Sequence, residues 1–493
     1  MKMINKSSQK IFNNSLLYSV GTVFSKAVGF FLVPIYTYNV SDADYGVATT
    51  ITMFVSTFGI VIMLSLRAAL IRFYNEYSDK EKSEFVGTIT TFVAINALVI
   101  CTLLCLLHEL YTPLLFKEIS FFPLVFLGIV SLGAEGIYLV YQSVLQAKQD
   151  GKQYSINSIL YLVVHAVAVV VFVWALQMGA VGIILSNCIT NILFATYGVL
   201  VMLRSQVMRF SWNNEMLFRS LKYSLPILPH NLSNNMNTYA TKLIINNYIG
   251  YVLSGMYSLA AQFSTIISLV QSSINLAFRP WFIEQMEKEE EGRVQIKYMT
   301  VMIMAIYSFV AVLISLFCKE IVLLMTEKSY AESWKMVPFF VVTQLIAFIY
   351  YSHVQALMYN VKMSKFTMVC SISGLVVNMI IALLLVGSFN IYGVLIANFI
   401  SQAVLATLTV IMSRKAGKVD FGLPKMILFV IMAIILSAVG MFISEQNTKI
   451  NIIEILLKLV ISVISFMLFI FPYRKDLLSL TKGLFANCNS KLQ

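Results

Sequence analysis

Charge is scarce in this sequence: only 12% of its 493 residues are Asp, Glu, Lys or Arg, about half the share usual in a soluble protein. Hydrophobic residues make up 59% of the chain, and the mean hydropathy is +0.82. A soluble surface needs roughly 25–35% charged residues, so this composition excludes a soluble or disordered chain. The sequence predicts an all-α polytopic membrane protein whose helices have lipid as their solvent.

The motifs of soluble enzymes are also missing. There is no GxGxxG, no P-loop, no HExxH and no GxSxG elbow, so nothing supports ATP hydrolysis or the catalysis typical of soluble sites. The six Cys form no CxxC pair and lie mostly inside apolar runs, which argues against a disulfide framework and a metal site. We therefore predict a protein that is not an enzyme and that needs neither a cofactor nor a metal.

Basic residues exceed acidic ones by 35 to 23, which gives a net charge of +12. In a soluble protein this excess would suggest a nucleic acid partner, but in a membrane protein Lys and Arg hold loops on the cytoplasmic side. With the N terminus inside, 27 Lys and Arg fall in or beside cytoplasmic segments and 4 fall in outside loops. This asymmetry predicts a multi-pass protein with both termini in the cytoplasm and no nucleic acid partner. Apolar runs of helical length predict fourteen spans, at residues 14–38, 46–70, 84–107, 121–145, 154–176, 180–203, 220–247, 252–278, 298–317, 333–359, 366–387, 391–413, 424–443 and 450–471.

The chain resembles itself at an offset of a little over 200 residues, which is typical of transporters built from two like halves. Four matches follow one another in the same order, with offsets between 205 and 213: residues 15–20 recur at 220–225, 138–145 at 351–358, 162–165 at 375–378 and 182–187 at 393–398. We expect a six-helix bundle over 1–205, a second over 206–415, and two additional helices with a cytoplasmic tail over 416–493. A cleft should lie between the two bundles, within one chain, so we expect a functional monomer.

Polar side chains follow one face of the first helix of each half. Their spacing of 4, 3 and 4 residues makes one stripe on an α-helix: Ser15, Ser19, Thr22 and Lys26 in the first half, and Asn231, Asn235, Thr238 and Lys242 in the second. Charge inside the bilayer is expensive and usually lines a protein interior or a wet cavity. We therefore predict that both stripes face the cleft and contact the substrate.

Two prolines, Pro226 and Pro229, fall inside the seventh predicted span. Each removes a backbone hydrogen bond and favours a kink, so this span is a candidate hinge for alternating access, although a static kink fits as well. Further cations stand near the inner ends of the second helix of each half, where they either bind substrate or anchor the helices by snorkelling: Arg67, Arg72 and Arg279.

Glu135 is the one carboxylate near the middle of a span among the first twelve spans. It either titrates and carries a coupling proton or pairs with Lys26. His230, on the polar proline-bearing helix, is a second candidate for proton coupling, against the plain alternative of a hydrogen-bonded packing residue. In the last span, Glu454 and Lys458 stand at i and i+4, which suggests a structural ion pair.

Several local patterns carry a family resemblance. They are Leu-Pro-Ile-Leu-Pro-His at 225–230, Phe-Arg-Pro-Trp-Phe at 278–282, Tyr-Ala-Glu-Ser-Trp at 330–334, and Gly-x-x-x-x-Asn at 182–187 and 393–398. With the two six-helix halves, the chain resembles the polysaccharide-transporter branch of the multidrug/oligosaccharidyl-lipid/polysaccharide exporter superfamily, which includes the Wzx-type flippases of O-antigen and capsule units.

The resemblance implies a flippase that moves a polyprenyl-pyrophosphate-linked oligosaccharide across the bacterial inner membrane by alternating access, driven by an ion gradient or the membrane potential. Its expected partners are this lipid-linked sugar, membrane lipids, and a polysaccharide polymerase with its chain-length regulator. The predicted cleft residues fit this cargo, because the cations would offset the negative charge of the pyrophosphate, and Ser, Thr and Asn can form hydrogen bonds with sugar hydroxyls.

Four other classes of protein are alternatives to this one. A lipid II flippase would share the span count and a cationic cleft, whereas a multidrug and toxin cation antiporter needs carboxylates on helices that here carry Lys. A membrane O-antigen polymerase or glycosyltransferase should have a large outside loop, and no predicted outside loop exceeds about fifteen residues. A purely structural scaffold would leave the two Lys stripes unexplained.

Overall fold

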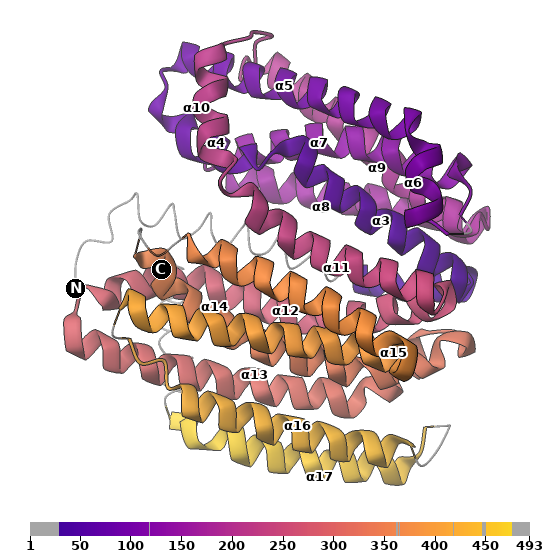
Figure 1. Ribbon diagram of the computed structural model, residues 1–493, viewed down its shortest axis with the longest axis vertical. Helices are drawn as coiled ribbons and strands as arrows, with labels where there is room; N and C mark the ends of the chain where they lie inside the picture. The colour runs from indigo at the N-terminus through magenta and orange to yellow at the C-terminus, as the bar shows by residue number, and fades with distance from the viewer. Residues whose placement is uncertain are drawn as a thin grey trace, which may run out of the picture. The chain divides into compact units, whose positions relative to one another are not determined.

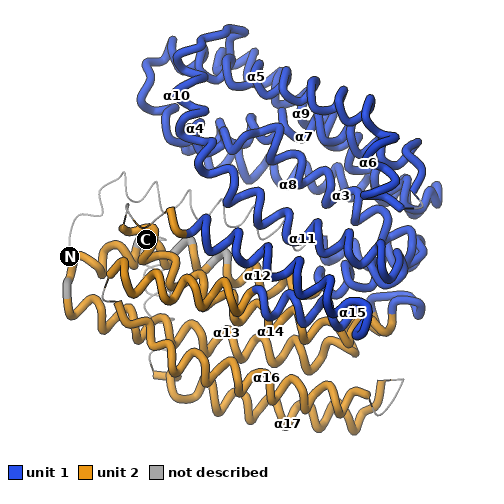
Figure 2. Tube along the Cα trace, in the orientation of Figure 1, with its two compact units in different colours: residues 1–262, 325–330, 367–401 blue, residues 263–324, 331–366, 402–493 orange. Residues whose placement is uncertain are grey.

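The computed structural model describes residues 29–117, 119–360, 363, 365–417, 419–445 and 450–475. Regular structure in these residues is helical throughout, with no strand, so the all-α prediction is confirmed (Figure 1). The chain forms two compact units (Figure 2): unit 1 comprises residues 1–262, 325–330 and 367–401, and unit 2 comprises 263–324, 331–366 and 402–493. These units differ from the halves expected from the internal repeat, whose boundaries stay a prediction.

Unit 1 holds the earlier helices and a central helix, α7, around which α3, α4, α5 and α9 pack. Glycine permits the closest of these contacts, because a Cβ at Gly128 of α7 would lie only 2.7 Å from Cγ2 of Ile51 on α3. In chain order, the elements up to α12, which begins in this unit and continues into unit 2, are α2 (Val33–Asn39), α3 (Asp42–Met63), α4 (Leu66–Phe73), η1 (Tyr74–Glu76), α5 (Asp79–Leu106), α6 (His108–Leu115), η2 (Phe121–Val125), α7 (Phe126–Ala147), α8 (Gly151–Val169), η3 (Val170–Ala175), α9 (Gly179–Arg204), α10 (Asn214–Ser224), α11 (Leu228–Tyr248) and α12 (Tyr251–Met286).

Unit 2 is built on α13 and α14, which are largely buried. The helices α16 and α17 lie side by side (Figure 1) and expose most of their apolar residues. Exposed apolar faces of this kind are what a helix presents to lipid. The remaining elements are α13 (Glu289–Met325), η4 (Lys328–Met336), α14 (Val337–Tyr359), α15 (Phe366–Ala416), α16 (Leu423–Glu445), α17 (Ile452–Phe469) and η5 (Phe471–Tyr473). Of these, η4 begins in unit 1, and residues 367–401 of α15 also belong to unit 1.

Eleven helical segments among the described residues are long and apolar enough to cross a membrane. One of them, α15, has 51 residues and is interrupted at Asn390, where φ is 51° and ψ is −137°. This break separates the two spans expected at 366–387 and 391–413. The helices are therefore consistent with fourteen spans and establish a polytopic membrane protein.

The seventh span, predicted over 220–247, divides into α10, which ends at Ser224, and α11, which begins at Leu228. The residues on either side of Pro226, between the two helices, keep right-handed helical backbone angles. Pro229 lies in the first turn of α11, where a backbone donor is not needed. The break is therefore a kink of the kind that the two prolines favour, and its use as a hinge stays a prediction.

The last helix is attached to unit 2 by buried charges. Lys319 of α13 lies 2.8 Å from Glu454 of α17, and Lys458 of α17 lies 2.5 Å from Glu320 of α13; Lys319 also donates to the carbonyl of Ser444, at 2.9 Å. The expected pairing of Glu454 with Lys458 is therefore wrong: each pairs across to α13. In an apolar bundle, opposite charges on facing helices can satisfy each other and leave the lipid face uncharged.

Candidate functional site

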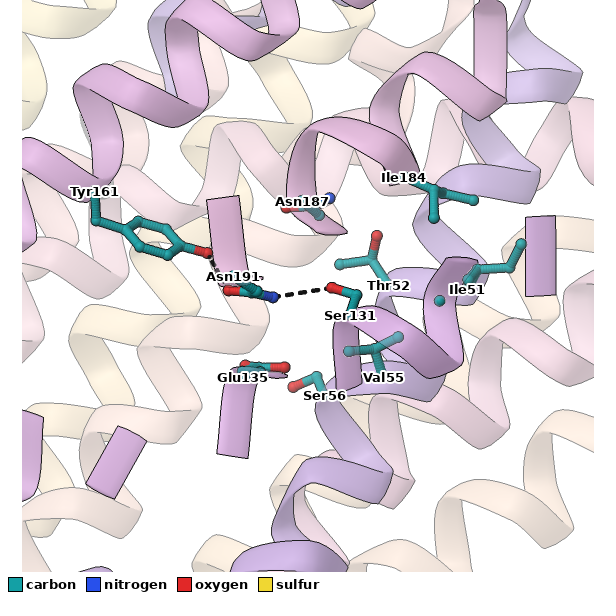
Figure 3. Close-up of a pocket in the computed structure, with 11 residues that line it drawn as sticks. Ile51, Thr52, Val55, Ser56, Ser131, Glu135, Tyr161, Ile184, Asn187 and Asn191 are labelled. Carbon is teal, nitrogen blue, oxygen red and sulfur yellow. Dashed lines mark hydrogen bonds between the residues drawn. The ribbon is translucent and has the colours of Figure 1, made fainter. Parts of the chain in front are cut away.

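Two adjoining cavities, each lined by several polar residues, lie in unit 1. The Asn191 cavity has a volume of about 210 Å³ and is shown in Figure 3; the Arg67 cavity has a volume of about 290 Å³. Ser56 and Glu135 line both. The other lining residues of the Asn191 cavity are Ile51, Thr52, Val55, Gly128, Ser131, Tyr161, Ile184, Asn187 and Asn191. Those of the Arg67 cavity are Gly59, Ile60, Met63, Ser65, Arg67, Leu139, Asn231, Asn234 and Asn235.

A chain of hydrogen bonds fixes the wall of the Asn191 cavity (Figure 3). The Tyr161 hydroxyl donates to Oδ1 of Asn191 at 2.8 Å, and Nδ2 of Asn191 donates to Oγ of Ser131 at 2.9 Å. These three residues come from α8, α9 and α7, so the network ties three helices together. Because both ends of the Asn191 amide are engaged, its orientation is set, and the cavity presents a defined polar surface.

Glu135 of α7 is the one carboxylate among the residues that line these cavities. Its Oε2 is 3.8 Å from where a Cβ would stand on Gly59, so the carboxylate lies against α3. Within the described part of the chain it forms no ion pair, and Lys26, its predicted partner, lies outside that part. A carboxylate in an apolar bundle that opens to polar cavities is suited to bind a proton or a cation.

The backbone between α3 and α4 forms one wall of the Arg67 cavity. Leu64 and Ser65 both have left-handed conformations, with φ of 46° and 58°, which are costly for residues with a side chain. This turn ends α3 and begins α4, so that Ser65 and Arg67 line the cavity. Nη2 of Arg67 donates to Oε1 of Gln146 at 2.9 Å.

The opposite wall of the Arg67 cavity is the polar face of α11. Nδ2 of Asn231 donates to Oγ of Ser65 at 3.1 Å, and Oγ of Ser56 donates to Oδ1 of Asn235 at 3.2 Å. Asn231 and Asn235 were singled out as part of a stripe in the sequence, and the structure brings them together with Arg67 and Glu135.

Other residues of the predicted stripes lie elsewhere. Lys242 is only 2% exposed, donates to Oγ1 of Thr49, and is not among the residues that line either cavity. Thr238 is exposed and also does not line them. Ser15, Ser19, Thr22 and Lys26 lie outside the described residues.

The remaining candidate site residues do not line either cavity. Arg72 lies 2.5 Å from Glu76, which also binds Arg219, in an exposed cluster at the end of α4. His230 of α11 hydrogen-bonds Ser371 through Nδ1, at 2.9 Å. Arg279 of α12 is exposed and belongs to unit 2.

Sequence reasoning missed most of the Asn191 cavity. Asn187 and Asn191 stand at i and i+4 on one face of α9, a pattern like the one that drew attention to α11. Ser131 and Tyr161 carry no such pattern, since small and aromatic residues are common in any apolar helix. Only the packing of α7, α8 and α9 brings them together.

The amino-acid sequence matches known proteins. Residues 11–286 match the sequence profile of the family described as Polysaccharide biosynthesis protein. A Haemophilus influenzae protein named for the Lsg locus is 24% identical over 286 residues, which are 57% of this chain and 68% of that protein.

Solved transporters share the fold. The lipid II flippase MurJ, in an inward closed conformation, matches with a TM-score of 0.70 and 16% identity over 94% of this chain and 100% of its own. An inward-facing multidrug resistance MATE family transporter of the MOP superfamily matches with a TM-score of 0.62 and 14% identity, over 81% and 94% of the two chains. A MOP superfamily transporter from Pyrococcus furiosus gives 0.56 and 16%, over 82% and 95%.

Proposed function

Because the chain belongs to the polysaccharide biosynthesis protein family, we propose that it is a flippase for a polyprenyl-pyrophosphate-linked oligosaccharide, the precursor of an O-antigen or capsule. It moves this lipid from the cytoplasmic to the outer face of the bacterial inner membrane, with both termini in the cytoplasm. It carries out no bond chemistry on its cargo.

The lining of the Arg67 cavity is the observation that supports this proposal. Arg67 lines this cavity together with three asparagines, Asn231, Asn234 and Asn235, and with serine residues. Amides and hydroxyls both donate and accept hydrogen bonds, as sugar hydroxyls require, and a guanidinium binds a phosphate oxygen with a fork of donors. A cavity with these groups inside an apolar bundle suits a polar cargo with negative charge.

Glu135 supplies the coupling in this proposal. It lies where the two cavities meet, so occupation of the Arg67 cavity and the charge state of Glu135 influence each other. A proton or cation that moves with the cargo draws on the membrane potential, at about 2.3 kcal/mol per charge for each 100 mV. His230 is the second candidate for this task, although Ser371 already occupies its Nδ1.

Glu135 also favours a second candidate function, the export of cationic compounds. A carboxylate without an ion pair among the described residues is the group that a cationic cargo would need, and a MATE transporter shares the fold. A lipid II flippase is the other alternative, since MurJ shares the fold as well. A cation exporter and a lipid II flippase carry cargo of opposite charge. Loss of the Arg67 charge should impair transport of an anionic cargo but not of a cationic one.

The test is complementation of a strain that lacks its own copy of the gene, with expression in the membrane measured by immunoblot. Arg67→Gln should reduce surface polysaccharide and trap lipid-linked units on the cytoplasmic side. Arg72→Gln is the matched control, because Arg72 is engaged with Glu76 on the exposed surface. Equal polysaccharide from both variants at equal expression would overturn the proposed role of the Arg67 cavity.

A further inference from the structure

Unit 2 has an apolar groove between α14, α15 and α16, with a volume of about 450 Å³. Its floor includes Ala403, Ala406 and Val410, which recur on one face of α15, and the two small side chains leave the groove hollow. Ile411 and Ile427 on its walls are each 44% exposed, so the groove is open at the surface of the unit. In a membrane protein, an open apolar surface of this kind faces acyl chains.

One end of this groove is cationic. Arg414, in the last turn of α15, lines both the groove and a second cavity of about 250 Å³. Among the described residues Arg414 forms no ion pair. The acid that lines the second cavity, Asp420, is already 2.6 Å from Lys297. The hydrogen bond from Lys297 is the main reason that the pKa of Asp420 lies below its ordinary value, so this acid stays engaged with the Lys side chain.

We propose that this groove binds one anionic glycerophospholipid of the bilayer, with an acyl chain along α15 and the phosphate on Arg414. An apolar groove that ends at a guanidinium with no ion pair in the described part of the chain complements a lipid with negative charge at its headgroup. A zwitterionic headgroup carries a positive charge beside its phosphate, so it gains less binding free energy from Arg414. The second cavity, walled by Phe421 and His353, gives the headgroup room beyond the end of the acyl chain. This site does not depend on the identity of the cargo.

Native mass spectrometry of the full chain tests the proposal. The protein is released from detergent with an equal mixture of dioleoyl phosphatidylglycerol and dioleoyl phosphatidylcholine, and the retained lipid is measured as collision energy rises. Wild type should retain phosphatidylglycerol in preference to phosphatidylcholine. Arg414→Gln should weaken retention of phosphatidylglycerol about fivefold, as expected for loss of one basic contact to an anionic lipid. Ala403→Phe, which fills the groove, should weaken retention of both lipids.

Lys415→Gln is the matched control, because Lys415 is an exposed cation of the same helical turn and is not among the groove's lining residues. Its lipid retention should equal that of wild type. Equal retention of the two lipids by wild type, or equal behaviour of the Arg414 and Lys415 variants, would overturn the proposal. Displacement of phosphatidylglycerol by a polyprenyl-pyrophosphate-linked sugar would also overturn it, since the groove would then belong to the cargo.

Discussion

Replacing Lys458 with Met should destabilise the attachment of α17 to α13 by about 3–5 kcal/mol, the usual cost of removing one partner from a buried ion pair. Lys458 is fully buried, and the side chain of its partner, Glu320, is 10% exposed. The other oxygen of that carboxylate, Oε2, has no hydrogen-bond partner among the described residues. The variant would therefore leave a buried acid with neither a cation nor a second donor.

The double variant Lys458→Met with Glu320→Leu removes both charges at once. Replacing a buried pair with apolar residues of similar size is often neutral or stabilising, so most of the lost free energy should return. A coupling energy of about 3 kcal/mol between the two positions is expected. The free energy of unfolding is measured by titrating the purified chain with SDS in mixed micelles, following helix content.

Lys425→Met is the control, because Lys425 is an exposed cation on α16, and its loss should change the free energy of unfolding by less than about 0.5 kcal/mol. The reasoning is refuted if the double variant is as unstable as the sum of its single variants. That outcome would mean that the two charges act independently and that apolar packing alone holds α17 in place.

Three further predictions concern Glu135, Gly128 and the two lysines of the predicted stripes. Glu135→Gln should abolish the dependence of transport on the ion gradient while the chain still binds its cargo, as measured by uptake and binding in proteoliposomes; unchanged coupling would assign that role elsewhere. Gly128→Val should destabilise the unit by at least about 1–3 kcal/mol through overpacking against Ile51, seen as a lower melting temperature than for Gly387→Val, a site with nothing within 4 Å. Lys26→Ala and Lys242→Ala, singly and together, should lower surface polysaccharide at normal expression if both side chains serve translocation; unchanged polysaccharide would make them packing or anchoring residues.

The sequence was enough to predict the fold class because span length and hydrophobicity are local properties. Each span needs about 20 apolar residues, whatever its neighbours are, so the helices could be located one at a time. The prediction was wrong for the ion pairs of the last helix, because spacing along one helix does not show which residues of another helix a charged side chain contacts. Glu454 and Lys458 have ideal spacing for a pair within one helix. Instead, Glu454 pairs with Lys319 and Lys458 with Glu320, both on α13 and some 135 residues away in the chain.

The candidate site could be predicted only in part for the same reason. Asn231 and Asn235 stood out because several polar residues share one helix face, and Glu135 stood out as a lone acid. Arg67 could not be distinguished from Arg72 by sequence, since both stand near the end of the same predicted span. Both side chains are exposed, and the structure distinguishes them by their neighbours: Arg67 lines the Arg67 cavity just after the turn at residues 64 and 65, whereas Arg72 pairs with Glu76.

Transport by the purified protein tests the central claim most directly. Proteoliposomes would carry a polyprenyl-pyrophosphate-linked oligosaccharide in the inner leaflet, and its arrival outside would be followed with an added glycosidase. The account predicts cleavage that exceeds protein-free liposomes, responds to an imposed membrane potential, and falls with Arg67→Gln but not with Arg72→Gln. Cleavage no greater than in protein-free liposomes, from vesicles that do extrude a cationic dye, would contradict the account and identify a cation exporter.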